Sequence, residues 1–263
     1  MTEWRSIIGD NPYMTSELDL DETVAALTEL LRSPDPATRD VFAYVRLARL
    51  VPHLDTDRRL RLGDTLLPAL QDEQIQVRTF APLILASLVN AGSYRPQWLA
   101  AFEAWYPNER DLRGHDPELG WLHAVAHGAD LLGEFGLCEE VEPAPLLRLA
   151  AARLLAPTEY VLRDQEDDRL AHAIATTLTR VELTTEESVG WLDPVEAAFK
   201  AGEPGPVPPQ ATNTMRTLRL LYLLADRGVR PDWGDSPAQQ LRHREELKER
   251  LAEVLALVAP FAG

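Results

Sequence analysis

The sequence predicts an all-α protein built from stacked helical hairpins, and three observations support this prediction. Apolar residues recur at intervals of three and four, as at Val24, Leu27 and Leu31, which is the period of an amphipathic helix. No alternating run of β-branched residues lies beside an Asn-Gly or Asp-Gly turn, so the sequence gives little support for a sheet. Prolines and acidic residues interrupt the apolar stretches where helices are expected to begin.

Four segments share one pattern, in which an acidic residue precedes an Ala/Leu-rich stretch. They begin at Asp35, Asp72, Asp116 and Asp164, at spacings of 37, 44 and 48 residues. These spacings bracket the roughly 40 to 47 residues of HEAT and armadillo repeats, whose second helices line the concave side of a superhelix. The sequence therefore predicts an α-α superhelix of the HEAT/armadillo type.

The expected helix starts lie at these prolines and acidic residues along the chain. They are Asp21, the SPDP stretch at 33–36, Asp72, Asp116 with Pro117, Pro143 with Pro145, and Ser236 with Pro237. The segment GEPGPVPPQ at 202–210 favours polyproline II and excludes a helix. So short a run usually bridges hairpins within one domain, so we expect a single helical-repeat domain over 1–263. The alternative is a C-terminal subdomain over 211–263.

Charge and composition limit the partners that we expect. Lys and Arg number 26 against 42 Asp and Glu, a formal charge of −16, and such a field repels nucleic acids and anionic membrane surfaces. Cys138 is the single cysteine, and charges interrupt every apolar stretch before it reaches the roughly 20 residues that span a bilayer. The N-terminus has no signal-peptide pattern. We therefore expect a cytoplasmic protein without nucleic-acid or membrane partners, and the oligomeric state stays open.

The densest polar cluster is expected on one helix in the middle of the chain. At 100° per residue, His123, His127, Asp130 and Glu134 fall within about 60° of one another, opposite an apolar face. Burial of that stripe without partners would be costly. The stripe is therefore expected to face a groove or a polar neighbour.

The same region belongs to a longer motif. ERDLRG at 109–114 precedes GWLHAVAHGAD at 120–130, and RDVFAY at 39–44, VRTFA at 77–81 and EDDRLAHAI at 166–174 accompany it. These segments resemble a bacterial family of HEAT-like helical proteins that is defined only as a domain of unknown function. The resemblance extends over about residues 36 to 180. It implies the all-helical fold and supplies no activity.

The leading functional hypothesis is that a small polar ligand or a partner peptide binds in the concave groove, where helical solenoids usually carry their function. The guanidinium groups of arginines on that face can bind a carboxylate or a phosphate through two hydrogen bonds. The predicted ligand-binding residues are Asp111, Arg113, Trp121, His123, His127, Asp130, Arg169 and His172.

The same residues also fit two other functions, and the sequence does not decide whether the protein is an enzyme. In the first, His123, His127 and Asp130 bind a divalent metal ion and the protein is a metal-dependent hydrolase. Asp111, Asp168 or His172 would complete the shell, although the Glu of an HExxH helix is absent. In the second, the protein is a purely structural protein–protein scaffold. The histidines then donate to backbone carbonyls, and Asp130 pairs with Arg110 or Arg113.

Several catalytic templates have no support in the sequence. GxSxG, GxxxxGK[ST] and GxGxxG motifs are absent. Glu139 and Glu140 follow Cys138, and their charges are expected to raise the pKa of its thiol. The aromatic side chains of Trp98, Trp105 and Tyr106 either line a pocket rim or belong to the core.

Overall fold

The computed structural model describes residues 19–203, 205–231 and 237–259 of the chain, and this part is predominantly α-helical. Its sole sheet is a two-stranded hairpin. The α-helices are α2 (Leu20–Leu30), α3 (Val45–Leu50), α4 (Thr56–Leu66), α5 (Ile75–Asn90), α6 (Pro96–Trp105), α7 (Ala124–Leu137), α8 (Pro143–Leu155), α9 (Glu166–Thr177), α10 (Thr185–Gly190), α11 (Asp193–Lys200), α12 (Pro209–Arg227) and α13 (Arg244–Ala256). Shorter helical segments are η1 (Ala37–Tyr44), η2 (Val51–His53), η3 (Leu67–Gln71) and η4 (Tyr106–Asn108).

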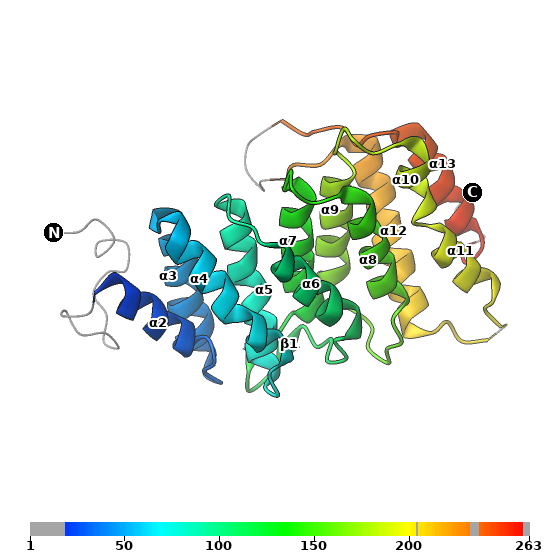
Figure 1. Cartoon of the computed structure of the whole chain (residues 1–263). Helices are drawn as coiled ribbons and strands as arrows, with labels where there is room; N and C mark the ends of the chain where they lie inside the picture. Colours follow the sequence, from blue (N-terminus) through cyan, green and yellow to red (C-terminus); the bar gives the residue numbers. More distant parts are fainter. Residues whose placement is uncertain (1–18, 204, 232–236, 260–263) are drawn as a thin grey trace.

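The helices form two rows (Figure 1). In one row, η1 with α3, then α5, α7, α9 and α12, pack side by side in chain order. The other row includes α4, which packs on α5, and α8, which packs on α7, α9 and α12. The segments of the first row begin at Ala37, Ile75, Ala124, Glu166 and Pro209, so their starts differ by 38, 49, 42 and 43 residues. The helices of the first row therefore begin at intervals of 38 to 49 residues.

Local sequence explains where many of these helices begin. Asp19 and Glu22 form a capping box at α2, and Thr184 and Glu187 form another at α10. Proline occupies one of the first two positions of α6, α8, α11 and α12, where its missing N–H costs no hydrogen bond. The predicted start at Pro143 is confirmed. The predicted start at Ser236 lies outside the described residues.

The expected helix start at Asp116 is wrong, because a β-hairpin occupies this segment. β1 (His115–Asp116) and β2 (Gly120–Trp121) pair antiparallel, with His115 opposite Trp121. The carboxylate of Asp116 accepts the amides of Glu118 and Leu119 at 2.9 Å each, so it closes a turn instead of capping a helix. Gly120 has φ 71°, which glycine adopts without strain. The helix α7 therefore begins only at Ala124.

Arg39 on η1 holds this hairpin through hydrogen bonds to its backbone. Its side chain is fully buried, and Nη2 donates to the carbonyls of Leu119 at 2.5 Å and Trp121 at 3.3 Å. Its Nε lies 2.7 Å from the carboxylate of Asp40. A buried guanidinium needs such partners to offset its desolvation. Arg39 thus positions the segment that leads into α7.

Small residues let the helix α7 pack closely against its neighbours. A Cβ on Gly128 would lie 2.1 Å from the ring of Tyr106, and one on Gly136 would lie 2.3 Å from Oγ1 of Thr177 on α9. Trp98, Trp105 and Tyr106 are all buried, so these three aromatic residues belong to the core and not to a pocket rim. The helices α7 and α9 therefore lie in close contact.

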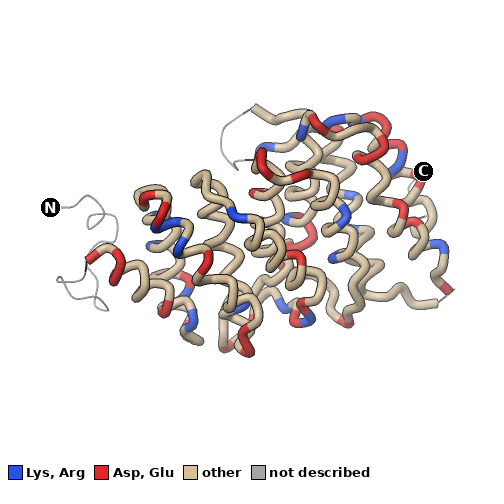
Figure 2. The backbone as a smooth tube through the Cα atoms, viewed as in Figure 1, with Lys and Arg blue, Asp and Glu red and all other residues tan. Residues whose placement is uncertain are grey.

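Charged residues of both signs are interspersed along the helices (Figure 2). Within the described part of the chain, the helices are too short or too polar to cross a bilayer.

Candidate functional site

A groove with a volume of about 820 Å³ lies along the first row of helices, with lining residues from α3, α5, α7, α9 and α12. This volume lies within the range of small-molecule pockets, which is roughly 300 to 1,000 Å³. Leu83, Leu137, Leu220 and Leu224 provide apolar lining. The polar lining includes Tyr44, Asn90, Asp130, Glu134, Asp168, Arg169 and His172.

Within the groove, Arg169 on α9 pairs with Asp130 on α7 through both carboxylate oxygens. The distance from Nε to Oδ1 is 3.0 Å, and Nη2 donates to Oδ2. Burial raises the pKa of the Asp130 carboxyl, and the Arg169 guanidinium opposes that rise. The partner of Asp130 is therefore Arg169. It is not Arg110 or Arg113, the partners expected if the protein were a purely structural scaffold.

The carboxylate of Glu134 lies one turn further along α7. Both of its oxygens lie 3.2 Å from the side-chain amide nitrogen of Asn90 on α5. Burial raises the pKa of the Glu134 carboxyl. Among the described residues it forms no ion pair with Lys or Arg. The groove therefore contains a carboxylate that a neutral amide stabilises and no cation neutralises.

His127 is a structural residue of the core. Its ring is buried, Nδ1 donates to the carbonyl of Thr79 at 2.9 Å, and the ring lies edge-on to Phe80 at a centroid distance of 5.1 Å. Burial lowers the pKa of His127 well below its usual value. A neutral imidazole that joins α7 to α5 explains all of these features.

His123 occupies the N-cap of α7 with a left-handed backbone, at φ 47° and ψ 40°. Its ring lies 4.4 Å from that of Trp121 and 5.7 Å from that of His127. Burial lowers the pKa of His123 to about 4. The Nε2 atom is buried and has no hydrogen-bond partner. Non-glycine residues rarely adopt this backbone conformation, which costs on the order of 1 to 3 kcal/mol.

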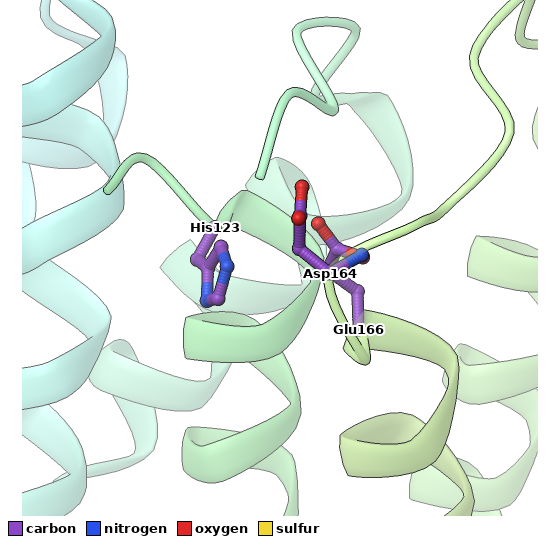
Figure 3. Close-up of side chains that lie close together, drawn as sticks. All are labelled: His123, Asp164 and Glu166. Carbon is purple, nitrogen blue, oxygen red and sulfur yellow. The ribbon is translucent and has the colours of Figure 1, made fainter. Parts of the chain in front are cut away.

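Two carboxylates from the start of α9 lie beside His123 (Figure 3). One potential metal-binding atom from each of His123, Asp164 and Glu166 lies within 4.8 Å of the other two. Within residues 19–203, 205–231 and 237–259, this is the one such group of three. Glu166 is fully buried. Its Oε2 accepts the amide of Asp164 at 2.8 Å, and its Oε1 has no partner. The sequence pattern indicates Asp164 and Glu166 only as parts of a helix start, and not as neighbours of His123.

The structure therefore divides the predicted ligand-binding residues between several places. Asp130, Arg169 and His172 line the groove. Asp111 and Arg113 form an ion pair with each other in the loop before β1. The remaining predicted residues are His123 and His127, described above, and Trp121, which is 45% exposed and contacts the rings of His115 and His123.

The thiol of Cys138 has the character that the sequence predicts. Burial and the neighbouring Glu140 carboxylate, whose Oε2 accepts a hydrogen bond from Sγ at 3.1 Å, raise its pKa to about 11. A protonated thiol is a poor nucleophile and a poor metal ligand.

Comparison with known protein families gives a match over residues 67–223, which is more than half of the chain. The matching model is described as a protein of unknown function, DUF2785. The chain belongs to this family. No curated protein and no solved structure matches it. The DUF2785 region extends from η3 into α12, so it contains His123, Asp164, Glu166 and most of the groove.

Proposed function

We propose that this DUF2785 protein binds a small organic ligand that carries a positive charge beside an apolar portion, and that the groove is its binding site. The observation that carries the proposal is the Glu134 carboxylate, which is half-buried and held by Asn90 without a cation. A half-buried carboxylate is stabilised when an ammonium or guanidinium group pairs with it. A bound amine would supply that missing partner.

The charge balance of the groove favours a cation over an anion. Asp130, Glu134 and Asp168 are acidic, whereas Arg169 is the basic lining residue and is already paired with Asp130. The leucines beside these groups favour an apolar portion on the same ligand. A lysine or arginine side chain of a partner peptide has the same chemistry, so a peptide is the macromolecular form of this ligand.

Two broader proposals accompany this one. We propose that the repeated hairpins form a HEAT-like superhelix, because the segments of the first row recur at 38 to 49 residues and the groove lies along that row. We also propose that the chain is one domain. The helix α12, which follows the Pro-rich segment, packs on α8 and α9 and contributes Leu220 and Leu224 to the groove.

The metal-dependent hydrolase with His123, His127 and Asp130 as ligands is not part of this proposal. Arg169 occupies both oxygens of Asp130, and Nδ1 of His127 donates to Thr79. A metal ion bound by these three residues would have to displace Arg169 and leave its guanidinium unpaired in the groove.

The test uses two probes of similar size and opposite charge, benzylamine and benzoate. Fragments of this size bind with millimolar dissociation constants, so ligand-observed NMR and thermal-shift titrations are suitable. We expect benzylamine to bind and benzoate not to bind. In Glu134→Gln, which keeps the shape of the side chain, the affinity for benzylamine should fall at least about tenfold.

Glu159→Gln is the matched control, because Glu159 is exposed and lies outside the groove. This variant should bind benzylamine as the wild type does. Equal binding of both probes, or an unchanged affinity in Glu134→Gln, would contradict the proposal. A purely structural scaffold would bind neither probe.

A further inference from the structure

We propose that His123, Asp164 and Glu166 form a binding site for one divalent transition-metal ion of the Zn²⁺ type. The site lies outside the set of groove-lining residues, where the N-terminal ends of α7 and α9 meet (Figure 3). It is independent of the amine site at Glu134, so either proposal can fail without the other.

The distances between the donor atoms fit an ion after a small movement. One atom from each residue lies within 4.8 Å of the other two. Zn²⁺ binds imidazole nitrogen and carboxylate oxygen at about 2.0 to 2.2 Å, which puts ligand atoms roughly 3 to 4 Å apart. The three donor atoms therefore need to approach one another by about 1 Å. Two carboxylates without a cation between them are expected to lie slightly apart.

Unsatisfied polar atoms provide the second, independent observation. Nε2 of His123 and Oε1 of Glu166 are both buried and have no hydrogen-bond partner. Buried polar atoms normally have partners, because an unpaired one costs about 1 to 3 kcal/mol. Both residues belong to the same small cluster, and Glu166 is fully buried. One bound ion would satisfy both of them.

His243 shows what a structural histidine at the same kind of position does. It is also a left-handed N-cap, at φ 50°, on α13. Its Nδ1 lies 3.0 Å from Oγ1 of Thr185, and its Nε2 lies 3.0 Å from the carbonyl of Leu183. Both ring nitrogens of His243 are therefore used within the protein, whereas His123 leaves Nε2 unused.

The charges also indicate a missing cation. Asp164 and Glu166 pair with no Lys or Arg within the part of the chain that the structure describes, and the nearby guanidinium of Arg169 is held by Asp130. Burial raises the pKa of the Glu166 carboxyl, and the Asp164 charge contributes to that rise. A divalent ion would neutralise both carboxylates.

The surrounding backbone holds the three ligands in place. Gly114 packs against the carboxylates, since a Cβ at this position would lie 2.3 Å from Oδ2 of Asp164 and from Oε1 of Glu166. The amide of His123 donates to the carbonyl of Gly114 at 3.2 Å. Gln165, which lies between the two acidic residues, also has a left-handed backbone, at φ 66°. Such rigid support is typical of metal sites.

The donor set selects the class of metal. One imidazole and two carboxylates suit Zn²⁺, Mn²⁺ or Fe²⁺, whereas Ca²⁺ takes six to eight oxygen ligands. Three protein ligands leave at least one coordination position for water, as in catalytic zinc sites. Because Gln165 lines the groove, the ion would lie near one end of the groove.

The test is a titration of the full-length, chelator-treated protein with ZnCl₂. Isothermal titration calorimetry measures binding, and the midpoint temperature of thermal unfolding measures the stability gained. We expect one ion per chain and a rise in the midpoint that grows with zinc concentration. Glu166→Gln and Asp164→Asn should each weaken zinc binding at least about 100-fold, since outer-shell changes alone cost tenfold or more. His53→Gln and Glu159→Gln alter exposed residues outside the cluster and should bind as the wild type does.

Asp164→Asn keeps the test decisive if Glu166→Gln does not fold, because Asp164 is only partly buried. Binding of Co²⁺ adds a spectroscopic readout, since its visible absorption reports the ligands directly and should disappear in Asp164→Asn. The proposal is overturned if Zn²⁺, Mn²⁺ and Fe²⁺ all fail to bind. It is also overturned if folded Asp164→Asn binds zinc with wild-type affinity, because the ion would then occupy another place.

Discussion

Arg169 on α9 holds both carboxylate oxygens of Asp130 on α7, and this pair joins the two helices within the groove. The two side chains are 29% and 22% exposed, so the pair is partly removed from water. A charge left alone in such a place costs more than the intact pair contributes to stability.

We therefore expect Arg169→Met to lower the free energy of unfolding by about 1 to 3 kcal/mol, because Asp130 would lose its cation. The double variant Asp130→Asn with Arg169→Met should be less destabilised than the sum of the two single variants. Urea unfolding at neutral pH measures this coupling. Strictly additive losses would show that the pair contributes nothing to the contact between α7 and α9.

Two glycines on α7 should respond to alanine in opposite directions. Gly128→Ala places a methyl group against the buried ring of Tyr106 and should lower the free energy of unfolding by about 1 to 3 kcal/mol. Gly133→Ala is the matched control on the same helix, since its Cβ would lie 3.6 Å from Ala173. There the higher helix propensity of alanine should stabilise the protein by up to about 1 kcal/mol. Thermal unfolding of both variants checks the difference, and equal effects would contradict the close packing at Tyr106.

Buried histidines should make stability depend on pH below neutrality. Burial lowers the pKa of His127 well below its usual value and that of His123 to about 4, whereas the unfolded chain titrates near 6.5. The unfolded state therefore binds more protons between these values. The contribution of each imidazole is complete above about pH 6.5 and is lost as the pH falls toward 4.

His127→Asn keeps an N–H for the carbonyl of Thr79 but does not titrate, so it should reduce the loss of unfolding free energy between pH 7 and pH 5. The reduction should be about 1 to 2 kcal/mol. His53→Asn, at an exposed position, is the control. Urea unfolding at the two pH values provides the comparison. If His127→Asn loses as much stability on acidification as the wild type, then His127 is not held neutral.

Much of the fold follows from short-range patterns. The three-and-four spacing of apolar residues and the proline starts depend only on neighbours along one helix, so the sequence predicts the helical class correctly. The hairpin at 115–121 depends on contacts that no local pattern carries. Arg39 lies about 80 residues from the carbonyls of Leu119 and Trp121 that it holds.

The candidate sites show the same limit. A helical wheel places His123 on the same stripe as Asp130, but the left-handed backbone at His123 removes it from that helix. Its neighbours Asp164 and Glu166 come from the start of α9, because the small residues of α7 let α9 approach closely. The wheel places Glu134 correctly beside Asp130 on the groove, since both lie inside α7.

The most direct test of the central claim is a crystal structure of the protein soaked with benzylamine at a concentration that saturates binding in solution. The account predicts that the amine nitrogen lies about 3 Å from the Glu134 carboxylate, with the ring against the leucines of the groove. Benzylamine bound elsewhere, or benzoate bound in the same place, would contradict it.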